Sequence, residues 1–503
     1  MTPTPWCPTL SPDEADRLLD LLRSWLPKQR WCPVNSADFQ LSGLQSYSLP
    51  ASVADASTHL VVGVLKLEFT TAEAGPRAVV LQVPLSFRTT VLEAKELLLV
   101  GQMDVAGESV FVYDGLADPA FVGAYLDLVR ERGSTGSAEG LGPLAGHRIP
   151  GAEENESLRI PHATGTVRIL SAEQSNTSVI INDGVSAAII KTFRVLAEGN
   201  NPEVEIGAAL TGAGVSEVPA TLGWIRGTWP RIDAADQPVS VNDSALEPGA
   251  RGEFAVVHEF LAGGLDAWAL TVAAAAAGDP FIAEAEALGA ATAEVHKRLA
   301  QSLPVAEQGV DVLGPLAERV RASWLEAAGV VGPYGPEVEA VLESLKGVDE
   351  QAQRIHGDLH LGQILQLPAD PLAGKAQRWA ILDFEGEPMR PVSQRSTPDL
   401  RLRDVVGMLR SFDYAAGAAE RENPAVQVPE TWVTNCTDAF MSGYGSVIEG
   451  TIDPRSPVFV ALWLDKALYE VVYELRNRPG WLGIPVDAVR RALAPSQGSG
   501  SER

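Results

Sequence analysis

Hydrophobic and polar residues change their spacing along the chain, and the change separates a strand-rich first half from a helix-rich second half. Segments 59–69 (HLVVGVLKLEF) and 78–87 (AVVLQVPLSF) are rich in valine and leucine with partial alternation, which predicts an antiparallel hairpin. A second hairpin is predicted within 167–196, where Asn182-Asp183-Gly184 joins two β-branched runs. From Trp268 onward the pattern is mostly helical.

Other segments carry clear start or stop signals. A helix is predicted over 11–26, because Ser11 is a good N-cap and Pro12 suits the first helical position. Helices are also predicted over 201–211 and after the turn at 114–115, and a strand is predicted over 254–260. The stretch 133–151 is rich in glycine, serine and alanine, which predicts a flexible connection.

These patterns predict an α+β chain in five parts. They are a β-rich N-terminal cap (1–90), an intermediate subdomain with a flexible connection (91–166), a small β lobe (167–262), a large helical lobe (263–496) and a disordered tail (497–503).

Composition narrows the class of protein. The 503 residues include 39 Lys and Arg and 65 Asp and Glu, a formal net charge of −26, which disfavours binding to nucleic acid or to an anionic membrane surface. Three cysteines without a CxxC motif support neither a disulfide framework nor a thiolate zinc site. No apolar run reaches the ~18 residues of a membrane span, and no signal peptide opens the chain. We therefore expect a cytoplasmic protein.

The densest chemistry lies in two segments, 355–365 (IHGDLHLGQIL) and 379–388 (WAILDFEGEP). A carboxylate beside His and Gly, a carboxamide five residues later, and a second carboxylate at the end of an apolar strand match the spacing of kinase catalytic machinery. In this interpretation Asp358 accepts the proton of a substrate hydroxyl. Oxygen ligands suit Mg²⁺, so Gln363 and Asp383 are its candidate ligands, and Glu385 is a third candidate for the metal or the acceptor.

A nucleotide-binding lobe is predicted upstream. Lys191 ends the second strand of the 167–196 hairpin, where a lysine can contact the α- and β-phosphates of ATP. A helical glutamate should orient this lysine; Glu203 and Glu205 are the candidates, and Glu205 is preferred. The remaining candidate nucleotide contacts are the polar turn residues Ser175, Asn176 and Thr177 and the hinge-strand residues Val257 and Glu259.

The two segments resemble the aminoglycoside-phosphotransferase-like kinases, which are bilobal relatives of protein kinases. Segments 383–416 and 465–485 are similar to bacterial maltokinases, with weaker echoes at 25–31, 81–88, 112–121 and 201–206. The resemblance implies a protein-kinase-like fold, with a small antiparallel β lobe and a large helical lobe behind an N-terminal cap. It implies transfer of the ATP γ-phosphoryl group to the anomeric hydroxyl of maltose, feeding α-glucan or glycogen synthesis.

The same resemblance implies an acceptor site on the helix at 465–478 and an association with an enzyme that isomerises trehalose to maltose. The candidate acceptor contacts are His360, Tyr469, Glu470, Tyr473, Glu474 and Arg476. Two other functions stay open: a kinase of another small acceptor, such as glucosamine or an aminoglycoside, and an inactive nucleotide-binding scaffold. Glucosamine kinases prefer an aspartate at the position of Glu385, which favours maltose.

Each of these residues also has a structural interpretation. Lys191 can be a solvated lysine at a strand end, and Glu203 and Glu205 can be first-turn acids favoured by the helix dipole. Charged residues at i, i+4 spacing in 465–478 can form a solvated ladder of ion pairs worth about 0.2–0.5 kcal/mol each. His296 is expected to be structural.

Overall fold

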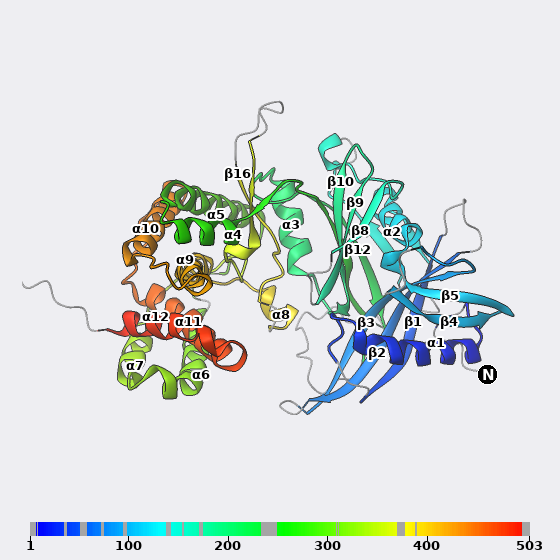
Figure 1. Ribbon diagram of the computed structural model, residues 1–503, viewed down its shortest axis with the longest axis horizontal. Helices are drawn as coiled ribbons and strands as arrows, with labels where there is room; N and C mark the ends of the chain where they lie inside the picture. Colours follow the sequence, from blue (N-terminus) through cyan, green and yellow to red (C-terminus); the bar gives the residue numbers. More distant parts are fainter. Residues whose placement is uncertain are drawn as a thin grey trace, which may run out of the picture. The chain divides into compact units, whose positions relative to one another are not determined.

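The computed structural model describes residues 7, 9–34, 38–50, 58–71, 75–93, 98–136, 142–152, 155–170, 175–232, 249–307, 309, 311–369, 378–387 and 390–494. The described chain forms two compact units (Figure 1). The first consists of residues 1–208, 219–262 and 391–394, and the second of 209–218, 263–390 and 395–503. The predicted tail at 497–503 lies outside the described residues.

The first unit is built on two antiparallel sheets. The first sheet has the order β1-β2-β3-β5-β4, with β11 paired to β3, and the second has the order β6-β7-β12-β13-β10-β9-β8. The first sheet's strands are β1 (Phe39–Leu49), β2 (His59–Thr71), β3 (Gly75–Arg88), β4 (Leu99–Val105), β5 (Glu108–Asp114) and β11 (Val195–Leu196). The second sheet's strands are β6 (Ser134–Thr135), β7 (Leu144–His147), β8 (Thr166–Ile169), β9 (Asn176–Asn182), β10 (Ala187–Phe193), β12 (Thr221–Trp229) and β13 (Ala250–Glu259).

Helices α1 (Pro12–Trp25) and α2 (Pro119–Glu131) cover the two faces of the first sheet, and the start of α3 (Pro202–Gly212) packs on the second sheet. Short 3₁₀ turns lie at Leu26–Lys28, Gly115–Ala117 and Glu156–Leu158. Val61 and Leu65 of β2 pack with α1, whereas Val62 and Val64 pack in a core shared with α2 and the second sheet. Because both faces of β2 are buried, its sequence reads as a nearly continuous apolar run.

Both predicted hairpins are present, as β2–β3 and β9–β10. The predicted intermediate subdomain at 91–166 is wrong: β4 and β5 extend the first sheet, while β6, β7 and β8 belong to the second. The flexible connection predicted at 133–151 also contains β6 and β7. Gly146 of β7 allows close packing, because a Cβ there would lie 1.9 Å from the carbonyl oxygen of Leu128.

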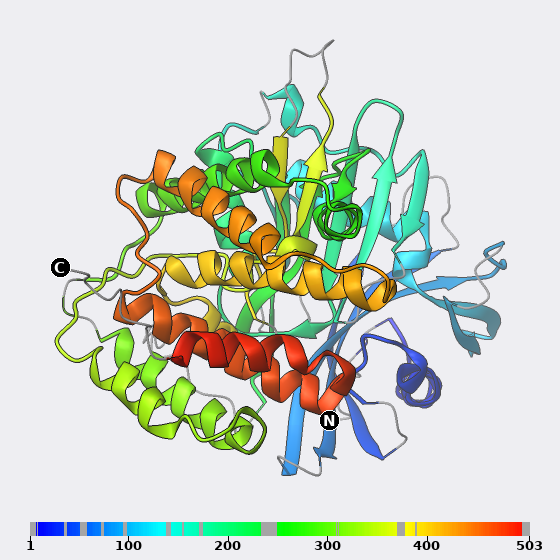
Figure 2. The same cartoon turned by 60° about the vertical axis from the view of Figure 1, so that its left-hand side comes forward.

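The second unit is mainly helical, as predicted for the large lobe. It contains α4 (Ala267–Ala277), α5 (Ile282–Ser302), α6 (Leu313–Val331), α7 (Gly335–Glu343), α9 (Leu402–Glu422), α10 (Glu430–Val447), α11 (Pro457–Asn477) and α12 (Gly483–Leu493). The short helix α8 (Val392–Arg395) lies where the chain passes between the units. Figure 2 shows α9 between α10 and α11, and α9 packs against both. In the described residues, no helix has the length and apolar character needed to span a membrane.

A small sheet holds the chemistry-bearing segments of the second unit. Its strands are β14 (Leu265–Asp266), β15 (Ile364–Leu367) and β16 (Arg378–Ile381), in the order β14-β15-β16. A 3₁₀ turn at Leu361–Gln363 leads into β15. The pairing of Ile364 with Ile381 brings the segment after Asp358 beside the start of the segment that carries Asp383. The sheet therefore places two parts of the predicted motif side by side.

Candidate active site

The turn that carries Asp358 is held from behind by a buried carboxylate. Gly357 has φ +85°, a conformation that favours glycine, and Asp404 of α9 accepts hydrogen bonds from the backbone N–H groups of His356 (2.8 Å) and Gly357 (2.9 Å). His296 of α5 lies 2.9 Å from Asp404 through Nε2 and 2.8 Å from the hydroxyl of Tyr444 through Nδ1. Burial alone would raise the pKa of Asp404, but its contacts with His296 and its backbone donors lower the pKa overall.

His356 connects this turn to the one that carries Asp383. Its Nε2 lies 2.8 Å from the carbonyl oxygen of Leu382, and its Nδ1 lies 3.2 Å from the backbone nitrogen of Asp358. A ring that donates through Nε2 and accepts through Nδ1 satisfies both contacts. The ring also packs against Phe384, with centroids 4.8 Å apart. These contacts use both ring nitrogens in holding the two turns together.

Gln363 and Asp383, the predicted metal ligands, are adjacent. The side-chain amide of Gln363 donates to Asp383 Oδ2 at 3.0 Å, and the backbone carbonyl oxygen of Gln363 accepts from the backbone N–H of Leu382 at 2.8 Å. Asp383 has φ +62°, an uncommon conformation for a residue with a side chain. A carboxylate and a carboxamide so placed match the hard oxygen donors that Mg²⁺ takes in proteins. Glu385 lies near Arg395, with 3.8 Å between Oε2 and Nη1.

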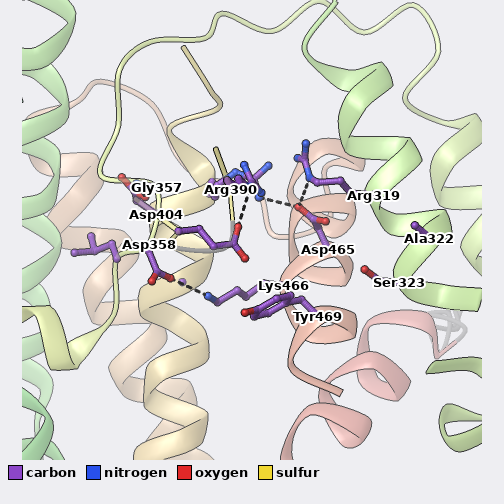
Figure 3. A pocket seen from close by; sticks show the side chains of 14 residues that line it. Arg319, Ala322, Ser323, Gly357, Asp358, Arg390, Asp404, Asp465, Lys466 and Tyr469 are labelled. Atoms are coloured by element: carbon purple, nitrogen blue, oxygen red, sulfur yellow. Dashed lines mark hydrogen bonds and ion pairs between the residues drawn. The ribbon is translucent and has the colours of Figure 1, made fainter. Parts of the chain in front are cut away.

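Asp358 lies at a cavity of about 200 Å³ whose lining comes from α6, α9, α11 and the two motif segments. Figure 3 shows its carboxylate facing Lys466 of α11, and Lys466 Nζ lies 3.4 Å from Asp358 Oδ1. Burial alone would lower the pKa of Lys466, but Asp358, Glu470 and Glu387 raise it. Lys466 is therefore an ammonium ion at neutral pH, beside the predicted proton acceptor.

Further ion pairs line the same cavity (Figure 3). Asp465 accepts from Arg403 at 2.7 Å and from Arg319 at 3.3 Å, and Arg390 pairs with Glu387 at 2.7 Å. Burial alone would raise the pKa of Asp465, but the two arginines lower it. A polar wall of fixed donors and acceptors suits a hydroxylated ligand better than an apolar one.

Of the predicted acceptor contacts, only Tyr469 is among the residues that line this cavity. Tyr473 is exposed and stacks on Tyr469, with centroids 6.4 Å apart. His360 accepts from the backbone of Gly362 at 3.1 Å, and burial lowers its pKa, so the ring is neutral at pH 7.

The other three predicted acceptor contacts have protein partners. Glu470 is buried and accepts from Arg410, Glu474 is buried and accepts from Arg478 and Tyr414, and Arg476 pairs with Glu326 at the surface. Because their charged groups already have these partners, the structure does not support Glu470, Glu474 and Arg476 as acceptor contacts. The residues of α11 that line the cavity are Asp465, Lys466 and Tyr469.

In the first unit, Lys191 of β10 pairs with Glu203, not with the preferred Glu205. Lys191 Nζ lies 2.8 Å from Glu203 Oε2, and His258 Nε2 lies 3.1 Å from the other oxygen. Residues two apart on a helix point to different sides, so only one of the two glutamates can face the sheet. Gly207, one turn after Glu203, marks that face: a Cβ there would lie 2.3 Å from the Thr221 hydroxyl.

The charge on Glu203 is maintained by these neighbours. Burial alone would raise its pKa, but the Lys191 ammonium and His258 hold the pKa well below its ordinary value. Glu203 is therefore ionised at neutral pH, and its contact holds the Lys191 side chain in place.

The other predicted nucleotide contacts lie in the strands of the second sheet or beside them. Val257 is paired with Ile190 on one side and Gly223 on the other, and the N–H of Glu259 donates to Ala220 at 2.8 Å. The N–H of Glu259 and the strand pairing of Val257 therefore serve the sheet, and a contact of either residue with the nucleotide stays a prediction. The buried Thr177 hydroxyl accepts from the buried Arg194 at 2.9 Å, and its contact with phosphate stays a prediction. Ser175 is exposed just before β9, which begins at Asn176.

Two residues of this site were missed by the sequence analysis. Asp404 had one available signal, an acidic residue directly before the apolar stretch 405–409 of a predicted helix. Lys466 lies on a helix that the sequence already connected with the acceptor, but nothing in the sequence showed that it faces Asp358, a residue 108 positions away.

Comparisons with known proteins agree with the fold and the motif. Residues 25–118 match a family described as the maltokinase N-terminal cap domain. A glucosamine kinase of Streptacidiphilus jiangxiensis is 28% identical over 389 residues, covering 71% of this chain and 81% of that protein. A glucosamine kinase of Mycolicibacterium smegmatis is 30% identical over 359 residues, covering 65% of this chain and 79% of that protein.

A solved structure, of a glucosamine kinase in complex with glucosamine, ADP and inorganic phosphate, shares the fold. Its TM-score is 0.61 at 22% identity, covering 95% of this chain and 99% of that one. The fold and the motif thus define a phosphotransferase that acts on a hydroxyl group. The chain belongs to the aminoglycoside-phosphotransferase-like family of sugar kinases with a maltokinase-type N-terminal cap. The predicted fold class and enzyme class are confirmed.

Proposed function

We propose that this sugar kinase transfers the γ-phosphoryl group of ATP to the anomeric hydroxyl of maltose, giving maltose 1-phosphate. The observation that carries the proposal is Asp358 at a polar cavity, with Oδ1 bound to Lys466 and no hydrogen bond at Oδ2 among the described residues. Oδ2 can therefore accept the proton of an acceptor hydroxyl. An association with a trehalose-isomerising enzyme stays a prediction.

The charges around the cavity favour a neutral acceptor. Each of the four carboxylates that line it already has a donor: Asp358 has Lys466, Glu387 has Arg390, Asp465 has two arginines, and Asp404 has His296 with two backbone N–H groups. A cationic amino sugar would have to compete with these groups for every carboxylate. A neutral disaccharide can instead hydrogen-bond to the fixed donors without displacing an ion pair.

The chemistry of three side chains supports a site for Mg²⁺ and ATP. The Lys191 ammonium suits a phosphate, and the side-chain oxygens of Gln363 and Asp383 suit Mg²⁺. Lys191 is oriented by Glu203, and the two metal candidates lie within hydrogen-bond distance of each other. When bound, Mg²⁺ neutralises charge on the phosphate oxygens. The relative whose structure is solved was crystallised with ADP, which fits this assignment.

The chain's own residues would align the reactants more than they would activate them. Asp404 and His356 fix the turn, and the turn presents Asp358 to the acceptor hydroxyl. Phosphoryl transfer has a loose transition state that leaves little covalent work for the protein, so catalysis depends on position and charge.

Glucosamine is the second candidate acceptor, because two relatives and a solved structure bear the name glucosamine kinase. The deciding experiment is a coupled ADP-release assay on the purified full-length protein with maltose, glucosamine, glucose and an aminoglycoside, followed by NMR of the product. We expect the highest kcat/KM with maltose and a phosphate on its anomeric oxygen. A higher kcat/KM with glucosamine would refute maltose as the acceptor, and absence of turnover with every sugar would refute the kinase itself.

The role of Asp358 is tested by Asp358→Asn, which keeps the shape of the side chain. Loss of the proton acceptor should lower kcat by about 10²–10⁴-fold while ATP still binds. Asp487→Asn, at an exposed position of the same unit, is the matched control. Near-normal turnover of Asp358→Asn would eliminate Asp358 as the base.

A further inference from the structure

Lys466 reaches the predicted base from a separate helix. Its ammonium lies 3.4 Å from Asp358 Oδ1, and the two side chains, which both line the cavity, point toward each other (Figure 3). The motif segment 355–365 contains no lysine or arginine, so the cation beside Asp358 comes from α11. This placement could not be anticipated from the spacing of the catalytic motif.

The position of Lys466 is held on both sides along α11. The preceding residue, Asp465, is bound by Arg403 and Arg319, which fixes the orientation of this turn of the helix. One turn on, the ring centre of Tyr469 lies 5.8 Å from Lys466 Nζ, within range of a cation–π contact. The ammonium is therefore directed toward the cavity by its own helix.

Stability alone does not explain this pair. Both side chains are partly exposed, at 28% for Lys466 and 24% for Asp358, and ion pairs of that kind typically contribute little to folding. Asp358 nevertheless has one oxygen bound by Lys466 and the other available at the cavity. A carboxylate held through one oxygen presents the other in a defined direction, which matters for a reaction that depends on alignment.

We propose that Lys466 is a positioning residue for phosphoryl transfer: it holds Asp358 through Oδ1 so that Oδ2 accepts the acceptor proton. In that step the acceptor oxygen bonds to phosphorus, the bond to the leaving diphosphate breaks with its electron pair, and the proton passes to Asp358. The ammonium also places positive charge at the cavity where the transferred group is anionic. The inference rests on the proposed role of Asp358 and is independent of which sugar is the acceptor.

The test compares Lys466→Met and Lys466→Arg in the full-length protein, with Lys297→Met as control, because Lys297 is exposed on α5. The acceptor is whichever sugar gives the highest wild-type turnover. We expect Lys466→Met to lower kcat by about 10–10²-fold, with KM for ATP within about threefold and thermal unfolding within about 3 °C, and we expect Lys466→Arg to recover part of the loss. A kcat within threefold of wild type, or a loss explained by unfolding, overturns the proposal.

A double variant decides whether Lys466 acts through Asp358. If it does, adding Lys466→Met to Asp358→Asn should lower kcat by less than about threefold further, because the group that Lys466 positions is already lost. Full multiplication of the two single effects overturns the proposal. Failure of the proposed function is seen separately: Asp358→Asn would then retain turnover, or the wild type would act on no sugar.

Discussion

Replacing Asp404 with alanine removes the carboxylate that holds the turn before Asp358. Three donors lose their acceptor: the backbone N–H groups of His356 and Gly357, at 2.8 and 2.9 Å, and His296 Nε2, at 2.9 Å. Asp404 is 1% exposed, so water cannot readily replace it. At about 1.5 kcal/mol for each bond to a charged acceptor, we expect Asp404→Ala to lower the free energy of unfolding by about 4–5 kcal/mol.

Asp404→Ala should also lower kcat, because the same hydrogen bonds position Asp358. A displacement of the turn by about 1 Å is enough to cost on the order of 10²-fold in kcat. Asp404→Asn keeps one acceptor oxygen and should lose roughly half of the unfolding free energy lost by the alanine variant. Comparing the unfolding free energies of the alanine and asparagine variants separates the contribution of the hydrogen bonds from that of the size of the side chain.

The assay is urea unfolding followed by tryptophan fluorescence and circular dichroism, with kcat measured on the folded variants. Asp438→Ala, at an exposed position on α10, is the control and should change the unfolding free energy by less than about 0.5 kcal/mol. If Asp404→Ala unfolds within about 1 kcal/mol of wild type and keeps its kcat, the reasoning from these bonds is refuted.

Three further results are expected. Asp383→Ala should abolish Mg²⁺-dependent nucleotide binding in calorimetry, and an unchanged affinity would contradict its role as a ligand. The pKa of Glu203 in the folded state lies below its usual 4.5, so the stabilisation that its carboxylate gives is complete above pH 4.5 and is lost on acidification. Glu203→Gln should therefore flatten the fall of the melting temperature below about pH 5. An unaltered slope would argue against the pair with Lys191. Gln82→Leu should lower the unfolding free energy by about 2–3 kcal/mol, because its amide donates to the carbonyls of Phe193 and Phe254 at 2.8 Å. Gln102 is exposed, so Gln102→Leu should leave the unfolding free energy unchanged. Equal losses in the two glutamine variants would contradict the role of Gln82 in joining the strands.

Local patterns predicted the elements and the motif because their signals lie close together in the chain. The hairpin at Asn182-Asp183-Gly184 and the capped helix after Ser11 follow from turn and capping chemistry within a few residues. The spacing of Asp358, Gln363 and Asp383 likewise identified one segment pair, and the pairing of β15 with β16 brings Gln363 to Asp383. The errors at 91–166 came from long-range pairing, since strands in that stretch join two different sheets.

The sequence by itself determined which side chains can perform the chemistry: a carboxylate, a carboxamide and a second carboxylate in kinase order, with a strand lysine upstream. Only the tertiary structure decided their partners. Glu203 rather than Glu205 meets Lys191, because the rotation of α3 against the sheet determines which side chain faces it. Lys466 meets Asp358, whereas Glu470, one turn along α11, is bound by Arg410 of α9. The periodicity of a sequence predicts which residues share a face of a helix, but the packing of distant segments determines what that face contacts.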